Sequence, residues 1–131
     1  MDRHFGTHIA HIIEDIIYIR CMGDLSPEAL GELLAIVDEV IAQHGRYGAV
    51  IDASQMGSVH PATRRLLSEW QGSKHCYGNA VFGQAFALRV SLTMAMRAVQ
   101  LFTRRPFPVA FFGTAKEAEA WLKVRGEQAR R

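Results

Sequence analysis

Groups able to do chemistry gather in one short segment of the chain. They are Asp52, Ser54, Ser58, His60, Arg64 and Arg65. We expect residues 53–60 to be a loop at the carboxyl end of a strand, where open α/β sheets usually bind ligands. Pro61 starts a helix after it, and a helix start offers unpaired amides to an anion. The segment is therefore our first candidate for a ligand or partner site.

The same segment contains a carboxylate, hydroxyls and an imidazole, which are the groups of a hydrolytic triad. In such an enzyme His60 and Asp52 would be the acid–base residues. The chain has no Gly-x-Ser-x-Gly elbow, and the groups are neighbours in sequence instead of coming from separate elements. Asp52 and Ser54 more often cap turns in such a loop. We therefore expect no catalytic residues, with a hydrolase as the minor alternative.

Metal, cofactor and nucleic-acid sites have little support. The six histidines form neither a His-Glu-x-x-His motif nor a cluster at ligand spacing. The two cysteines, Cys21 and Cys76, form no Cys-x-x-Cys pair. There is no glycine-rich phosphate loop, and the short basic pairs lack interleaved aromatic residues. We expect no metal, no cofactor and no nucleic-acid partner.

Apolar runs predict the strands that position these residues. Isoleucine-rich runs predict strands over 5–13 and 16–22, joined by a tight turn at Glu14 and Asp15 and ended by a break at 23–25. In the second run both the odd-numbered and the even-numbered residues are mostly apolar, so both faces of the strand are apolar. We therefore expect this strand to be central and covered by helices on both faces. Shorter runs predict the remaining strands over 49–52, 79–82 and 108–112.

Four helices are expected, beginning near Ser26, Pro61, Gln84 and Thr114. Serine can cap the first helix, and Pro27 suits its first position because no amide hydrogen bond is lost there. Thr114 and Glu117 form a capping-box pattern at the last helix. Residues 126–131 are polar and expected to fray.

This order of elements implies a single α/β domain over residues 1–131. We predict a mostly parallel five-stranded sheet with an N-terminal antiparallel hairpin and about four helices. The N-terminus has no signal-peptide pattern, and no uncharged apolar run approaches the roughly 20 residues that span a bilayer. We therefore expect a cytoplasmic protein without a transmembrane segment.

Charge is distributed unevenly, although the net charge is only +2. Residues 1–69 contain five basic and ten acidic side chains, whereas residues 70–116 contain six basic and no acidic ones. The simpler interpretation is that the two parts neutralise each other across the fold. The alternative is a basic face for an acidic ligand, protein or lipid surface.

The expected helix over 84–103 is apolar around more than half of its circumference. Its predicted inner face consists of Leu88, Leu92, Ala95, Met96, Val99 and Phe102. Met94 and Leu101 extend the apolar arc, and Arg89 and Arg97 belong to a narrow polar stripe. A surface helix on a sheet needs a narrower arc, so the excess must contact something else. The alternatives are a neighbouring helix of the same domain, a second copy in a homodimer, or an apolar ligand such as a lipid chain. The arginines would then meet a phosphate headgroup.

Short motifs resemble a known superfamily. Residues 23–28 (GDLSPE) resemble the start of the first helix in STAS domains, which include anti-sigma-factor antagonists and the cytoplasmic domains of sulfate transporters. Residues 49–54 (AVIDAS) resemble their strand that ends in aspartate. Residues 61–65, Trp70 and residues 118–122 resemble the SpoIIAA-like bacterial branch. The resemblance runs from about residue 5 to residue 122 and implies the STAS fold.

One departure concerns the phosphorylation switch of these antagonists. They carry an Asp-Ser-Ser-Gly-type segment, whose serine is phosphorylated, at the start of the second helix. In this chain Ala62 falls at the acceptor position, and Ser58 and Thr63 are nearby but outside the motif. The resemblance therefore implies the fold without the serine switch.

These observations predict a non-enzymatic regulatory or protein-interaction module that binds a protein partner or itself, as a homodimer. Its predicted contact residues are Asp52, Ser54, Ser58, His60, Arg64, Arg65, Arg89, Met94, Arg97 and Leu101. The alternative is a carrier or sensor of a small amphipathic or anionic ligand, such as a lipid, held between the long helix and the sheet.

Overall fold

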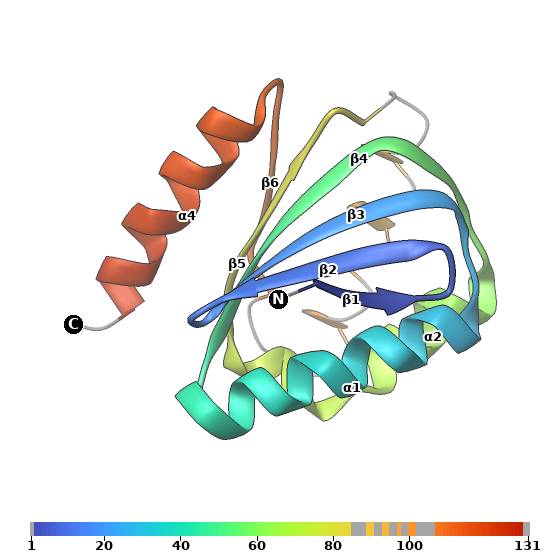
Figure 1. Ribbon diagram of the computed structural model, residues 1–131, viewed down its shortest axis with the longest axis horizontal. Coiled ribbons are helices and arrows are strands. Elements are labelled where there is room, and N and C mark those ends of the chain that lie inside the picture. The colour runs from blue at the N-terminus through green and yellow to red at the C-terminus, as the bar shows by residue number, and fades with distance from the viewer. Residues whose placement is uncertain are drawn as a thin grey trace.

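The structure, a computed structural model, describes residues 2–84, 89, 90, 93, 94, 97, 100, 101 and 107–129. Six strands form one sheet in the order β1-β2-β3-β4-β5-β6 (Figure 1). They are β1 (Asp2–Phe5), β2 (His8–Ile13), β3 (Ile16–Leu25), β4 (Tyr47–Val59), β5 (Cys76–Phe82) and β6 (Val109–Phe112). Strands β1, β2 and β3 pair antiparallel, and β3 to β6 pair parallel.

The helices begin where the sequence predicts. They are α1 (Pro27–His44), α2 (Pro61–Glu69) and α4 (Ala115–Ala129), with a short 3₁₀ helix, η1 (Gln71–His75). The Ser26 side chain accepts a hydrogen bond from the Ala29 amide at 3.1 Å. The Thr114 hydroxyl accepts from the Glu117 amide at 3.2 Å and donates to the Glu117 carboxylate at 3.1 Å. These contacts confirm both predicted caps.

The third predicted helix, 84–103, lies mostly outside the described residues. Its described members at 89, 90, 93, 94, 97, 100 and 101 are helical. Its predicted inner face, made of Leu88, Leu92, Ala95, Met96, Val99 and Phe102, lies outside them. None of the helices that the structure describes is long and apolar enough to cross a membrane.

The strand count differs from the prediction of five. A turn at Gly6 and Thr7 divides the N-terminal segment into β1 and β2, and Gly6 has a φ of 63°. Glycine adopts that backbone conformation without the steric cost that a Cβ would add. The predicted turn at Glu14 and Asp15 is confirmed.

Residues 53–59 are not the predicted loop, and residues 23–25 do not break their strand. Strands β3 and β4 continue side by side, with Gly23 opposite Met56 and Leu25 opposite Val59. Register irregularities between residues 20 and 25 accommodate the pairing. The Ser58 amide donates to the Asp24 carboxylate at 2.8 Å, which closes this end of the ladder. Pairing with a distant strand overrides the local turn signal.

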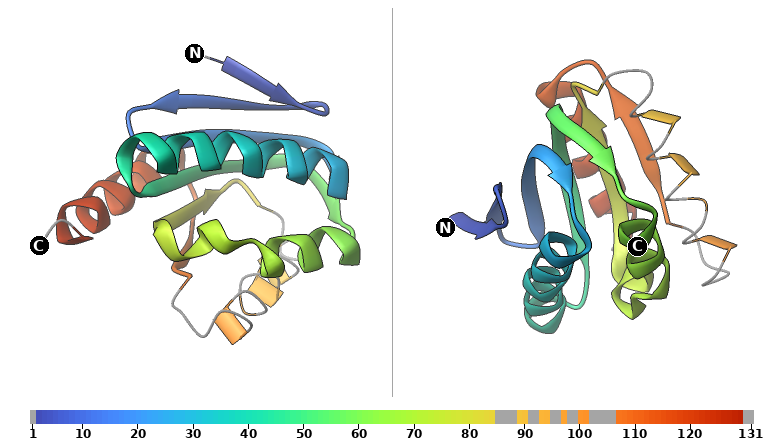
Figure 2. Two further views of the ribbon diagram at one scale, coloured as in Figure 1. Left: turned by 90° about the horizontal axis from the view of Figure 1, so that it is seen from below. Right: turned by 90° about the vertical axis from the view of Figure 1, so that its right-hand side faces the viewer.

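Helices α1 and α2 pack on one face of the sheet, and α4 packs on the other (Figure 1 and Figure 2). The first layer joins β3 and β4 to the apolar face of α1, for example through Ile17 and Leu33. The second layer joins β4, β5 and β6 to α4, for example through Ala80 and Leu122.

The α4 side of β3 lacks the helical cover that we predicted. Met22 is 36% exposed there, and Ile13 on the adjacent strand β2 is 50% exposed. Helix α4 packs mainly on β4, β5 and β6, so none of the helices that the structure describes covers the half-sheet formed by β1, β2 and β3 on this side.

The C-terminal segment 126–131, which we expect to fray, is helical as far as residue 129. Helix α4 continues through residues 126–129, and residues 130 and 131 lie outside the description. Gly126 is buried, and its carbonyl accepts a hydrogen bond from Arg46 Nη1 at 2.7 Å. This contact fixes the last turns of the helix against the start of β4.

Candidate functional site

The extension of β4 separates the polar residues that the sequence places together. Asp52 and His60 are eight residues apart, which corresponds to about 26 Å along an extended strand. Asp52 accepts hydrogen bonds from the Ser54 amide at 3.0 Å and from its hydroxyl at 2.7 Å. His60 instead caps α2, and its Nδ1 accepts from the Ala62 amide at 3.0 Å. The hypothetical hydrolytic triad is therefore not assembled.

The other predicted residues of this segment also face different surroundings. Ser58 is exposed, and its amide pairs with Asp24. Arg65 is exposed on α2, whereas Arg64 is half-buried and borders an apolar cavity. The segment thus offers a cationic edge near the start of α2 without a single convergent polar site.

The apolar cavity lies between the sheet and helices α1 and α2. Its volume is about 100 Å³. Ile19, Leu33, Leu67 and Trp70 are among its lining side chains, and Arg64 is its only charged one among the described residues. It is smaller than the 300–1,000 Å³ typical of ligand pockets.

The predicted residues of the third helix form an exposed stripe, which we call the 90–101 stripe: Val90, Met94, Arg97 and Leu101. The three apolar members are 46%, 56% and 80% exposed, in that order, and Arg97 is exposed between them. At about 100° per residue these four positions fall within an arc of about 60°. Few solvated helices align apolar side chains in this way, so the stripe is suited to contact with another surface.

Two contacts hold the segment that carries the stripe against β6 and the residues just before it. The Arg89 guanidinium lies 5.0 Å from the centre of the Phe111 ring. The Gln100 amide donates to the Phe107 carbonyl at 3.1 Å. Phe111 packs in a cluster with Val81 and Ile51, and Ile51 also packs on the core under α1. The stripe therefore belongs to the side of the sheet that carries α1 and α2.

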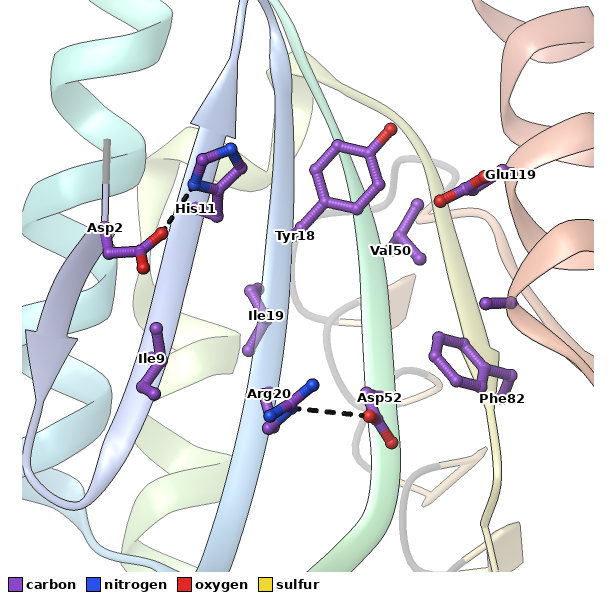
Figure 3. Close-up of a pocket in the computed structure, with 11 residues that line it drawn as sticks. Asp2, Ile9, His11, Tyr18, Ile19, Arg20, Val50, Asp52, Phe82 and Glu119 are labelled. Carbon is purple, nitrogen blue, oxygen red and sulfur yellow. Dashed lines mark hydrogen bonds and ion pairs between the residues drawn. The ribbon is translucent and has the colours of Figure 1, made fainter.

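A second feature, a groove of about 300 Å³, lies on the open half of the α4 side. Figure 3 shows its charged rim: the Asp2–His11 pair at one edge, Glu119 of α4 at the other, and Arg20 and Asp52 between them. Arg20 Nε lies 3.6 Å from Asp52 Oδ2, and the histidine ring contacts the Asp2 carboxylate.

The floor of the groove is apolar, formed by side chains such as Ile9, Val50 and Phe82. Tyr18 projects from β3 between the edges (Figure 3). Partial burial, with the Glu119 charge as a smaller cause, raises the pKa of the Tyr18 hydroxyl, which stays protonated at neutral pH.

Sequence reasoning found only Asp52 of this groove. The signal it missed is the alternation in β2 and β3, where His11, Tyr18 and Arg20 share strand faces with isoleucines. In the part of the chain that the structure describes, no three histidine, cysteine, aspartate or glutamate side chains gather as a metal site would require.

Comparisons with known proteins agree with this geometry. The family model described as SpoIIAA-like matches residues 16–123. The chain belongs to the SpoIIAA-like family. Its fold is similar to that of a protein from the DUF3478 family with a SpoIIAA-like fold from Shewanella loihica PV-4. That match has a TM-score of 0.59 and 18% identity, and covers 93% of this chain and 90% of the other.

The SpoIIAA-like fold also resembles the structure of the anti-sigma factor antagonist SpoIIAA in its unphosphorylated form. Here the TM-score is 0.53 and the identity 16%, with 89% of this chain and 96% of the other covered. No curated protein shows significant similarity to this chain. At these identities the two structures establish the fold, and they confirm the predicted resemblance.

In this SpoIIAA-like chain the start of α2 offers few hydroxyl groups for modification. Ala62 has none, and Thr63 is buried with its Oγ1 donating to the Leu25 carbonyl at 2.9 Å. Phosphorylation of Thr63 would break a buried contact between α2 and β3. Neither residue 62 nor residue 63 therefore presents an exposed hydroxyl at the start of α2.

Proposed function

We propose that this SpoIIAA-like chain is a non-enzymatic protein-interaction module whose contact surface is the 90–101 stripe. The observation that carries the proposal is the alignment of exposed Val90, Met94 and Leu101 beside Arg97. Single exposed apolar residues are ordinary on a protein surface, but an aligned set with a cationic neighbour has the composition of a binding surface.

A related structure supports this role. The solved protein SpoIIAA is an anti-sigma factor antagonist, so that relative acts on a protein. The predicted residues His60, Arg64 and Arg65 lie at the start of α2 on the same side of the sheet, and the two arginines add positive charge to that side. Residues 70–116 contain six basic and no acidic side chains. We therefore expect the partner to present carboxylates around an apolar patch.

The location we propose for the module is the cytoplasm. Cys21 and Cys76 are both unpaired thiols, of which Cys21 is buried. Free thiols are ordinary in a reducing compartment, whereas secreted domains of this size often use disulfides.

Site-specific photo-crosslinking in the native host tests the proposal. A photoreactive amino acid replaces Met94 in one strain and Val124, which is 52% exposed on α4, in a control strain. We expect a discrete protein adduct from position 94 that Leu101→Glu abolishes, and no such adduct from position 124. Absence of any specific adduct at position 94 would count against an interaction surface there.

A carrier of a small amphipathic ligand is the second candidate, favoured by the apolar cavity bordered by Arg64. An engineered cavity of about 150 Å³ binds benzene, so a lipid chain would require this 100 Å³ cavity to widen. Native mass spectrometry of gently purified protein is the test. A reproducible extra mass that is reduced by Arg64→Glu would support a carrier, and protein that never carries such a mass would exclude it.

A further inference from the structure

We propose that the 90–101 stripe of one copy docks on the open half-sheet of a second copy, so that the chain associates head to tail. This deepens the proposed function, on which it rests, by naming the partner. We define the open half-sheet as the α4-side surface of β1, β2 and β3, which includes Ile13, Ile16 and Met22, together with the groove of Figure 3.

Exposed apolar side chains concentrate on these two surfaces. Among the described residues, the large hydrophobic side chains that are most exposed are Ile13, Met22, Val90, Met94, Leu101 and Val124. The first two lie on the open half-sheet and the next three on the stripe. Only Val124 lies elsewhere, on α4. The two surfaces are thus the main unpaired apolar areas of the described chain.

Their dimensions match. Strands β1 to β3 span two interstrand spacings, about 10 Å, which is the diameter of one α-helix. Residues 90 and 101 of a helix are about 17 Å apart along its axis. Residues 16 and 22 of a strand are about 20 Å apart. One helix therefore fits over the open half-sheet beside α4, and completes the layer that α4 begins.

Charge decides which surface pairs with which. Three carboxylates line the groove, those of Asp2, Asp52 and Glu119. The arginine of the groove, Arg20, forms an ion pair with Asp52. Two open half-sheets facing each other would bring these carboxylates together, and two stripes would bring Arg97 against its own copy. Like charges oppose both arrangements. When the stripe of one copy instead lies on the half-sheet of the other, Arg97 faces the groove that these three carboxylates line.

The contact cannot form within one copy. The stripe belongs to the α1 and α2 side of the sheet, as the contact of Arg89 with Phe111 shows, and the open half-sheet is on the α4 side. Each copy therefore has the 90–101 stripe on one side of its sheet and the open half-sheet on the other. A heterologous contact of this kind extends into a chain of copies unless its geometry closes a ring.

Sedimentation equilibrium of full-length variants tests this arrangement. The sheet variant carries Ile13→Lys and Met22→Lys, and the stripe variant carries Met94→Glu and Leu101→Glu. All four positions are exposed, so folding should be retained, and far-UV circular dichroism checks it. Val124→Glu is the matched control, because its side chain is 52% exposed, within the range of the four mutated positions, but lies on neither surface.

The expected result is a mass that rises with concentration for wild type and for Val124→Glu, and a monomer for each double variant. A one-to-one mixture of the two double variants should reach twice the 14.6 kDa of one chain and stop there, since one good surface remains on each. A monomeric wild type, or a mixture that stays monomeric, overturns the inference. Association that survives in the sheet variant also overturns it, because the stripes would then pair with each other.

The outcome is separable from that of the crosslinking experiment. If position 94 crosslinks to a different protein while wild type stays monomeric, the proposed function stands and self-association fails. If position 94 forms no specific adduct and wild type stays monomeric, both fail.

Discussion

Arg46→Ala should destabilise the protein strongly, because this side chain connects the sheet to α4. Arg46 Nε donates to Asp15 Oδ2 at 2.8 Å, and Nη1 donates to the Gly126 carbonyl at 2.7 Å. The guanidinium also lies 4.5 Å from the centre of the Tyr77 ring. The Asp15 carboxylate is buried, with the Tyr77 hydroxyl at 3.1 Å as its other side-chain partner.

The expected loss in the free energy of unfolding is about 3 kcal/mol. Removing one partner of a buried ion pair typically costs about 3–5 kcal/mol, since the remaining charge stays buried. We take the lower end because the Arg46 side chain is partly exposed. For a chain of this length, that loss corresponds to a fall in Tm of about 10 °C.

The matched control is Arg20→Ala, which removes an arginine from an exposed pair. Arg20 Nε lies 3.6 Å from Asp52 Oδ2, and its side chain is 59% exposed. Exposed pairs contribute below about 1 kcal/mol. Urea unfolding of both variants, with hydrogen exchange of the α4 amides, measures the difference. If Arg46→Ala unfolds within 1 kcal/mol of Arg20→Ala, the buried network does not hold α4 in place.

Further predictions concern buried groups. His8 is buried, and burial lowers its pKa although a hydrogen bond with the Asp24 backbone opposes this. As the pH falls, the unfolded state therefore binds the proton before the folded state does. The free energy of unfolding should be highest above pH 6.5 and fall as the pH drops through the lowered pKa. Urea unfolding between pH 7.5 and about 5 should show this fall, and His8→Gln should flatten the pH dependence. Gly48→Ala should destabilise the fold by about 2 kcal/mol or more in thermal unfolding, because the new Cβ would lie 2.6 Å from the Tyr77 ring; an unchanged Tm would show that the ring moves freely. Thr63→Val should cost about 1–2 kcal/mol, as it leaves the buried Leu25 carbonyl without this partner, whereas Ser58→Ala, at an exposed position, should be near neutral. Burial raises the pKa of Cys21 to about 12 and that of Cys76 to about 11, so iodoacetamide at pH 8 should label both slowly until urea unfolds the chain, and rapid native labelling would contradict the raised pKa values.

The sequence by itself determined the local features of this protein. Ser26 with Pro27, and Thr114 with Glu117, locate helix starts because a cap depends on residues within one turn. The turn at Glu14 and Asp15 and the apolar strand centres follow from nearest-neighbour patterns. These features also sufficed for the resemblance to the SpoIIAA-like family, because its motifs are short and local.

Only the tertiary structure decided what depends on distant pairing. The local sequence of residues 53–59 predicts a loop, but in the fold β3 provides hydrogen-bond partners for their amides and carbonyls. The resulting extension of β4 separates Asp52 from His60. The open half-sheet arises because α4 covers only part of one face, which no periodicity in β3 reveals. The network around Arg46 likewise joins residues 15, 77 and 126, which are remote in sequence. Such contacts depend on where elements pack, and a local pattern fixes an element's type but not its neighbours.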